Sequence, residues 1–232
     1  INPAAVARVE AGELPFDEPG APEVMARVAG RTLDATTDPA CVAGAEHVVI
    51  VVGTPVDEHL NPDPRAIPRA LAGCAEHLVD GQVLVLRSTV YPGVTHLVER
   101  MVADLGVAVE VAFCPERIAE GRAMVELFTL PQIVAARTPE TRERAAALFR
   151  RLAPEVVFLE PEEAELAKLF TNVYRYIQFA TVNQFYMMAN ERGLDFEEIR
   201  QAITQDYDRA RDMPRAGFAA GPCLFKDTMQ LG

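Results

Sequence analysis

The stretch HVVIVV, residues 47–52, is a continuous run of mainly β-branched apolar side chains that ends at Gly53. A run of this length and composition is typical of a strand that is buried on both faces of a sheet. Further short apolar runs follow at 82–86, 107–113, 132–135 and 156–159. These runs predict five strands.

Helical patterns separate the predicted strands. They lie around 65–79, from about Pro92-Gly93 onward, and over 139–152, where Thr138 and Pro139 predict an N-cap and a first helical position. Strands that alternate with helices of this length imply crossover connections. The sequence therefore predicts an α/β fold with a parallel, doubly wound sheet.

The pattern changes near Pro161. From Glu162 to about Arg192 the chain contains no Gly or Pro, which predicts one helix on the order of 45 Å long at about 1.5 Å per residue. Its apolar positions recur at helical spacing: Leu166, Leu169, Val173, Ile177, Ala180, Phe185 and Met188. We expect a division into 1–160 and an α-helical domain over 161–232, with helix 162–192 as the surface of a homodimer.

Composition excludes several classes of function. The 232 residues are 50% hydrophobic and carry 22 Lys and Arg against 34 Asp and Glu, a formal net charge of −12. A nucleic-acid partner normally needs a basic face, so none is expected, and no apolar run reaches the roughly 20 residues of a membrane span. The four cysteines, Cys41, Cys74, Cys114 and Cys223, form no CxxC pair. We therefore expect neither a metal site nor a disulfide framework, and a reducing cytoplasm as the location.

Small polar clusters follow three of the predicted strands. They are Gly53-Thr54-Pro55, Ser88-Thr89 and Cys114-Pro115-Glu116-Arg117. Such residues commonly make turns, but ligands of doubly wound sheets bind beyond the carboxyl ends of the strands. Three successive clusters therefore favour a binding edge.

A second group of polar residues lies on predicted helices. Lys168 and Asn172 are four residues apart, so they share a helix face, as a solvated stripe would also do. Cys223 could be a small buried apolar residue, but it follows the small-residue loop 217–222 and opens a predicted helix with Lys226 and Asp227. A thiol at a helix N-terminus beside a lysine favours its thiolate form.

Several motifs together resemble the nucleotide-sugar 6-dehydrogenases, the UDP-glucose and UDP-N-acetylhexosamine dehydrogenases. They are GELPFDEPG (12–20), VVGTPVDEHLNP (51–62), RSTVYPGVT (87–95), CPERIAEG (114–121), EAELAKLFTN (163–172) and GPCLFKDTMQL (221–231), in the order and approximate spacing of the family. The resemblance implies oxidation of the C6 hydroxymethyl of a UDP-sugar to a carboxylate, with NAD as cofactor and a thioester on the enzyme.

The resemblance also implies roles for individual residues. Cys223 would attack the C6 aldehyde, with Lys168 and Asn172 stabilising the oxyanions, Asp227 and a water held by Thr89 managing protons, and Glu116 or Glu120 activating the hydrolytic water. The implied cofactor contacts are Thr54, Pro55, Ser88, Thr89, Glu120 and Lys226. The implied substrate contacts are Glu116, Arg117, Lys168, Asn172, Phe218 and Gly221.

On the same resemblance, residues 1–160 would be an incomplete NAD-binding, Rossmann-like domain. Its first strand and GxGxxG turn would precede Ile1, and a UDP-binding domain would follow Gly232. The CPER and VGTPVDE segments favour a UDP-N-acetylhexosamine, whereas Glu120 and the CLFKD string are similar to the UDP-glucose branch, and Ala220 stands where the family has a glycine. A 3-hydroxyacid type of dehydrogenase and a catalytically inactive binding protein are the alternatives from other classes.

Overall fold

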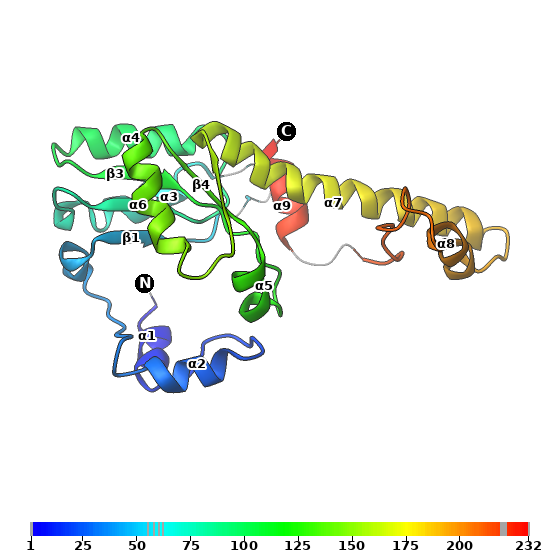
Figure 1. The fold of residues 1–232 in the computed structure, drawn as a ribbon, viewed down its shortest axis with the longest axis horizontal. Helices are drawn as coiled ribbons and strands as arrows, with labels where there is room; N and C mark the ends of the chain where they lie inside the picture. Colours follow the sequence, from blue (N-terminus) through cyan, green and yellow to red (C-terminus); the bar gives the residue numbers. More distant parts are fainter. Residues whose placement is uncertain are drawn as a thin grey trace. The chain divides into compact units, whose positions relative to one another are not determined.

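The computed structural model describes residues 2–54, 56, 57, 59, 61, 63–218 and 222–231, without the side chains of Pro222 and Cys223. The chain forms two compact units (Figure 1). The first consists of Ile1–Thr54 and Pro64–Glu165, and the second of Pro55–Asp63 and Leu166–Gly232.

A five-stranded sheet forms the centre of the first unit. Its strands are β1 (His47–Ile50), β2 (Val83–Leu86), β3 (Glu110–Phe113), β4 (Gln132–Ala136) and β5 (Val156–Leu159), and they lie side by side in chain order. All five predicted strands are therefore present. The pairs β1–β2, β2–β3 and β4–β5 are parallel.

The predicted doubly wound parallel sheet is present in mixed form, because the β3–β4 pair is antiparallel. In a parallel pair, the connection must run from the carboxyl end of the first strand back to the opposite end of the sheet, where the second strand begins. The β3–β4 connection contains only the seven-residue helix α5 (Ala123–Thr129), about 10 Å long at 1.5 Å per residue. β4 therefore begins at the end of the sheet where β3 finishes, and it runs antiparallel to β3.

Helices cover both faces of the sheet's centre. Helix α6 (Pro139–Phe149), which begins at the predicted N-cap Thr138, packs on β2 to β5 (Figure 1). Its Ala145 and Phe149 share a core cluster with one alternating set of strand side chains: Val83, Val85, Ala112, Cys114, Val134 and Ala136. The alternate positions, such as Leu84 and Phe113, are equally buried, and helices α3 (Ala66–Ala72) and α4 (Val94–Asp104) pack on β1 and β3 respectively.

The outer strand β1 departs from its prediction. Val48 and Ile50 are buried, but Val49 is 42% exposed, so this strand is buried on one face only. The remaining elements of the first unit are the helices α1 (Pro3–Glu10) and α2 (Ala21–Val28) and the 3-10 turns η1 (Pro39–Gly44) and η2 (Ala75–His77).

The second unit is helical, as predicted. Helix α7 (Pro161–Asn190) begins in the first unit and continues through the second, and Gly193, with a φ of +68°, follows its end. Helix α8 (Phe196–Thr204) packs back on α7 through the edge-to-face pair Tyr186–Phe196. Helix α9 (Pro222–Leu231) places Phe225 against Tyr176 of α7.

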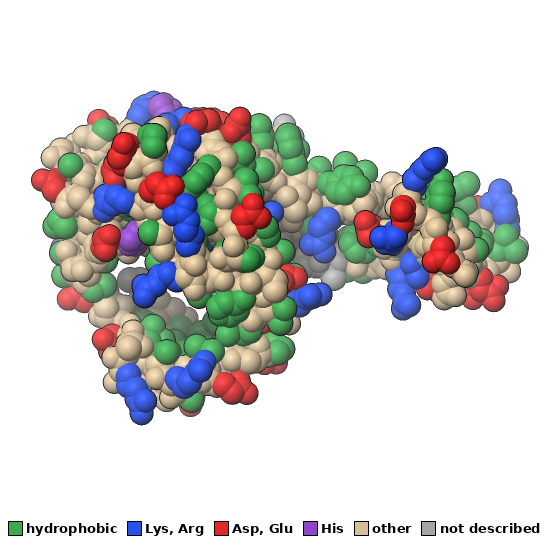
Figure 2. All heavy atoms as spheres, viewed as in Figure 1, with side chains coloured by type: hydrophobic (Ala, Val, Ile, Leu, Met, Phe, Trp, Pro, Cys, Tyr) green, Lys and Arg blue, Asp and Glu red, His purple; other side chains and the backbone are tan. Residues whose placement is uncertain are grey.

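Helix α7 carries an apolar stripe that the described chain leaves uncovered. Leu169, predicted to belong to a self-association surface, is instead fully buried, because it lies on the inward face of the helix. The exposed large side chains on one face are Phe170, Tyr174, Ile177, Phe185 and Met188. At about 100° per residue they lie within roughly 80° of one another around the helix. Figure 2 shows hydrophobic side chains at the surface along α7. No helix in the described ranges is long and apolar enough to cross a membrane.

Candidate functional site

Hydrogen bonds join the polar residues that follow β1 and β2. The backbone N–H of Val52 donates to the hydroxyl of Ser88 at 2.8 Å, and the hydroxyl of Thr54 donates to the carbonyl of Thr89 at 2.7 Å. Ser88 and Thr54 are buried, and Thr89 is half-buried. The predicted edge therefore brings Thr54, Ser88 and Thr89 together, whereas Pro55 lies outside the described residues.

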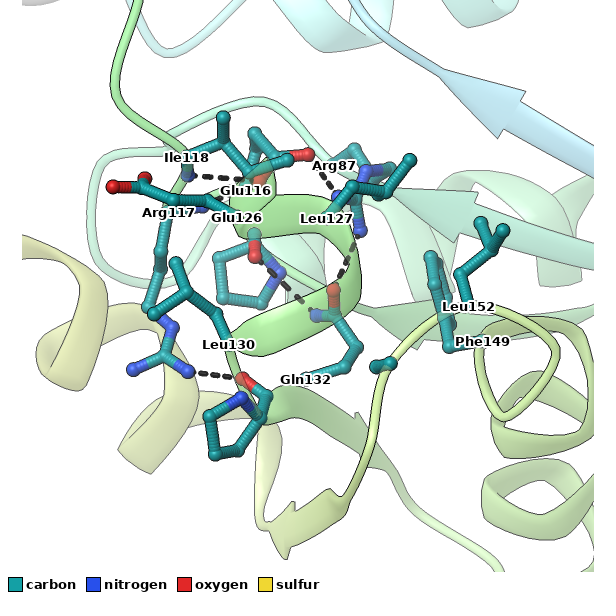
Figure 3. Close-up of a pocket in the computed structure, with 13 residues that line it drawn as sticks. Arg87, Glu116, Arg117, Ile118, Glu126, Leu127, Leu130, Gln132, Phe149 and Leu152 are labelled. Carbon is teal, nitrogen blue, oxygen red and sulfur yellow. Dashed lines mark hydrogen bonds and ion pairs between the residues drawn. The ribbon is translucent and has the colours of Figure 1, made fainter. Parts of the chain in front are cut away.

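Glu116 lies in the loop after β3, joined to the same edge. Its N–H donates to the carbonyl of Arg87 at 3.1 Å, and its carboxylate forms an ion pair with the Arg87 guanidinium (Figure 3). The second carboxylate oxygen accepts hydrogen bonds from the N–H groups of Arg117 and Ile118 at 2.8 and 2.9 Å. Both oxygens of the Glu116 carboxylate thus have partners, and these contacts stabilise the loop after β3.

Arg87 is a partly buried cation, and polar groups around the end of β2 accept its hydrogen bonds. It donates to the Cys114 carbonyl and to Gln132 Oε1, both at 3.1 Å, and its guanidinium lies 4.8 Å from the centre of the Phe149 ring. Arg117 points away from this cluster and donates to the Pro131 carbonyl (Figure 3). The space between these side chains holds about 20 Å³, enough for one water and no larger ligand.

Glu120 and Cys114 lie in the same loop in contrasting environments. The Glu120 side chain is exposed on the turn before α5. Cys114 is fully buried, and burial raises the pKa of its thiol to about 12. A thiol that remains protonated at neutral pH is a poor nucleophile, so Cys114 is not a candidate for covalent chemistry.

The second unit gathers a separate polar cluster. Asn172 on α7 donates through Nδ2 to Asp227 Oδ2 on α9 at 2.5 Å, and both residues are buried. The other oxygen, Asp227 Oδ1, lies 3.3 Å from Lys226 Nζ but accepts no hydrogen bond within the described part of the chain. Lys168, one turn before Asn172, is also buried. A lysine, an amide and a carboxylate are thus withdrawn from water in this unit.

Position 223 lies in the first turn of α9, one turn before Asp227. Its side chain and Gly221 lie outside the described residues. The preceding loop is held at Gly217, whose N–H and carbonyl both pair with the Asn183 side-chain amide at 2.9 Å. Phe218, 91% exposed, lines with Asn183 and Tyr186 a surface hollow of about 530 Å³.

Sequence reasoning missed the residues that support these groups. Arg87, Gln132 and Asn183 each bind backbone or side chains far away in the sequence, and although Arg87 opens the motif 87–95, nothing local indicated these partners. The only available signal was that Arg87 directly follows a fully buried strand and Asn183 interrupts an apolar helix.

Comparison with known proteins identifies the family. Residues 1–153 match the sequence model described as the UDP-glucose/GDP-mannose dehydrogenase family, NAD binding domain, and residues 162–232 match that family's central domain. The chain belongs to the UDP-glucose/GDP-mannose dehydrogenase family. Residues 1–153, which contain β1 to β4, therefore correspond to the family's NAD-binding domain.

Individual members of the family align over nearly the whole chain. It is 30% identical to a UDP-N-acetyl-D-mannosamine dehydrogenase of Salmonella typhi over 98% of its length and 56% of that relative. It is similar to the structure of a UDP-glucose dehydrogenase from Pyrobaculum islandicum, with a TM-score of 0.91 and 28% identity over 100% of this chain and 56% of that one. For the UDP-D-ManNAc dehydrogenase from Pyrococcus horikoshii the TM-score is 0.92, with 25% identity over 99% and 56%. The chain thus spans just over half the length of these relatives.

Proposed function

We propose that this chain is the NAD-binding and central part of a UDP-sugar 6-dehydrogenase that oxidises the C6 alcohol of a UDP-hexose to the acid in two steps. The observation that carries the proposal is the buried hydrogen-bonded pair Asn172–Asp227. Asp227 lies one helical turn after position 223 on α9, and Asn172 lies one turn after Lys168 on α7. A nucleophile, two oxyanion donors and a proton acceptor are the groups that an acyl-enzyme route requires.

The first unit offers residues that fit a dinucleotide. Thr54, Ser88 and Thr89 lie at the carboxyl ends of parallel strands, where such ligands bind, and their hydroxyls are small enough to let a ribose and a nicotinamide approach the backbone. We assign cofactor contacts to these three residues, to Pro55 and Glu120, and to Lys226 of the second unit. When bound, NAD⁺ accepts one hydride from C6 in each of the two oxidations.

In our proposal the Cys223 thiolate adds to the aldehyde carbon formed in the first oxidation. The C6 oxygen of this thiohemiacetal gives up its proton as the second hydride leaves, and a thioester remains. A position in the first turn of a helix, near Lys226, favours the thiolate. Asp227 would accept the proton, since one of its buried oxygens accepts no hydrogen bond in the described chain.

Lys168 and Asn172 would stabilise negative charge on the C6 oxygen. The Asn172 amide has two N–H donors, and Asp227 accepts from one of them. This hydrogen bond orients the amide, so the second N–H is preorganised toward a developing oxyanion. Phe218, Gly221 and Arg117 complete the proposed substrate contacts.

Water then releases the acid from Cys223, with Glu116 or Glu120 as the base. The Glu116 carboxylate is held by Arg87 and two backbone N–H groups, whereas Glu120 is exposed. Separate Glu116→Gln and Glu120→Gln variants distinguish them, because loss of the base should let the Cys223 thioester accumulate. Mass spectrometry of the acid-quenched enzyme measures that adduct.

The favoured substrate is a UDP-N-acetylhexosamine, UDP-N-acetylmannosamine or UDP-N-acetylglucosamine, and UDP-glucose is the alternative. Similarity to relatives named as UDP-N-acetyl-D-mannosamine and UDP-N-acetyl-D-glucosamine dehydrogenases supports the first choice. Similarity to a structure named UDP-glucose dehydrogenase keeps the second open. A catalytically inactive binding protein is the alternative from another class.

The natural full-length protein, mixed with NAD⁺ and each of the three UDP-sugars in turn, tests this proposal. We expect two NADH per sugar consumed, and the highest kcat/KM with an N-acetylhexosamine. One NADH per sugar would contradict the thioester route, and no NADH with any sugar would favour the inactive alternative.

We also propose that the apolar stripe of α7 is the interface of a homodimer. Five large side chains along one face of this helix are exposed in the single chain, and a second copy of the same helix would cover them. The free thiols Cys41, Cys74 and Cys114 support a reducing cytoplasm as the site of the reaction.

A further inference from the structure

The turn that carries Glu120 is clamped on both sides by carboxylates. Immediately before it, the N–H of Ala119 donates to Glu126 Oε2 at 2.8 Å. Immediately after it, the N–H of Gly121 donates to Glu18 Oε2 at 2.9 Å, and that of Ala123 donates to Glu18 Oε1 at 2.7 Å. The two backbone neighbours of Glu120 are therefore fixed, while its own side chain extends into solvent.

Glu18 makes this arrangement from a distant part of the sequence. It lies in the segment between α1 and α2, about a hundred positions before the turn, and only 7% of its surface is exposed. Gly20 also lies close to this region, since a Cβ at position 20 would be 3.5 Å from the Met124 side chain at the start of α5. Burial of an ionised carboxylate is costly unless hydrogen bonds compensate for the lost water, and here two backbone N–H groups do so.

We infer that Glu18 is a positioning residue for Glu120, and that it sets the geometry with which Glu120 meets the cofactor. The inference rests on the proposed function, in which Glu120 contacts NAD. Without the clamp the Glu120 turn would sample several backbone conformations, and binding of the dinucleotide would have to select one of them. Glu126 acts on the same turn from α5.

The test uses the natural full-length protein and the substitution Glu18→Gln. The amide keeps one oxygen acceptor but turns an NH₂ group toward the second backbone donor, so one of the two hydrogen bonds is lost. We expect the KM for NAD⁺ and its Kd without sugar to rise about tenfold, which corresponds to about 1.4 kcal/mol, with kcat at saturation nearly unchanged. Glu23→Gln is the matched control, because Glu23 is an exposed glutamate in the first turn of α2, five positions after Glu18.

A double-mutant cycle separates positioning from general stability. In a Glu120→Gln background, Glu18→Gln should raise the Kd for NAD⁺, measured without sugar, no further, whereas independent effects would multiply. If Glu18→Gln fails to fold, Glu126→Gln breaks the clamp from the other side and should give the same coupling. Tight NAD⁺ binding by wild type and by both clamp variants would overturn the inference. Absence of NAD⁺ binding in the wild type would instead overturn the proposed function on which it rests.

Discussion

Glu165, in the first turns of α7, gives the sharpest test of what holds the N-terminus of helix α4 in the first unit. Helix α4 begins at Gly93 without a side-chain cap of its own, and Glu165, 70 or more positions later, supplies one. Its two carboxylate oxygens accept from the N–H groups of Gly93 and Thr95 at 2.7 and 2.8 Å, and only 1% of the residue is exposed. Glu165→Gln preserves the shape and removes the charge.

The expected loss follows from these contacts. In the variant, the side-chain NH₂ group faces one of the two backbone N–H donors, so one hydrogen bond to a charged group is lost. Such a bond contributes about 1.5 to 3 kcal/mol. The favourable charge at a helix N-terminus, about 0.3 to 1 kcal/mol, is lost as well. We therefore expect local stability to fall by about 2 to 4 kcal/mol, and amide exchange at 93–95 to accelerate by about 30-fold to 10³-fold.

Hydrogen exchange measured by mass spectrometry on peptides that cover 92–96 reports this loss directly. Glu191→Gln, an exposed position just beyond the end of α7, is the control and should leave those peptides unchanged. Unaltered exchange at 93–95 in Glu165→Gln would refute the reasoning, because it would mean that the carboxylate contributes nothing to the start of α4.

Three further predictions concern other parts of the chain. Because burial raises the pKa of the Cys114 thiol to about 12, iodoacetamide at pH 8 should leave Cys114 unmodified in the folded protein; rapid labelling there would contradict the burial. Arg137→Met should lower the free energy of unfolding by about 0.5 to 1 kcal/mol at pH 7, as measured by urea titration. Arg137 holds the pKa of Glu162 below its usual value, so this stabilisation is present above the unfolded-state pKa and is lost as the pH falls through the folded-state pKa. A difference that persists undiminished well below both values would be evidence against the ion pair. Ile177→Asp should shift the natural protein toward monomer in analytical ultracentrifugation, whereas Arg175→Glu, on another face of α7, should not; equal behaviour of the two would count against the stripe.

The elements themselves were largely predictable from sequence. The five strands and the long helix follow from runs and periodicities that are local properties, and β5 even has the predicted bounds. The direction of β4 was not predictable in this way, because pairing direction depends on where the 114–131 connection lies relative to the sheet. The exposure of Val49 and the burial of Leu169 likewise depend on which neighbours cover them.

The candidate site divides along the same line. Spacing alone suggested that position 223 and Asp227 share a helix face, and that Lys168 and Asn172 do so on another helix. Spacing could not reveal that Asn172 binds Asp227, since their hydrogen bond spans 55 positions. Glu18 lies in the motif 12–20, but its role was not predictable for the same reason, because the backbone N–H groups that it binds are about a hundred positions away.

The central claim, covalent catalysis at Cys223, is tested most directly by turnover of Cys223→Ser in the natural full-length protein, with NADH and the sugar acid both quantified. Cys41→Ser, at an exposed cysteine, is the matched control. We predict that Cys41→Ser keeps wild-type turnover and that Cys223→Ser forms no acid, because a serine hydroxyl is far less ionised than a thiol at neutral pH. Retention of more than about a few per cent of wild-type acid formation by Cys223→Ser would contradict the covalent mechanism.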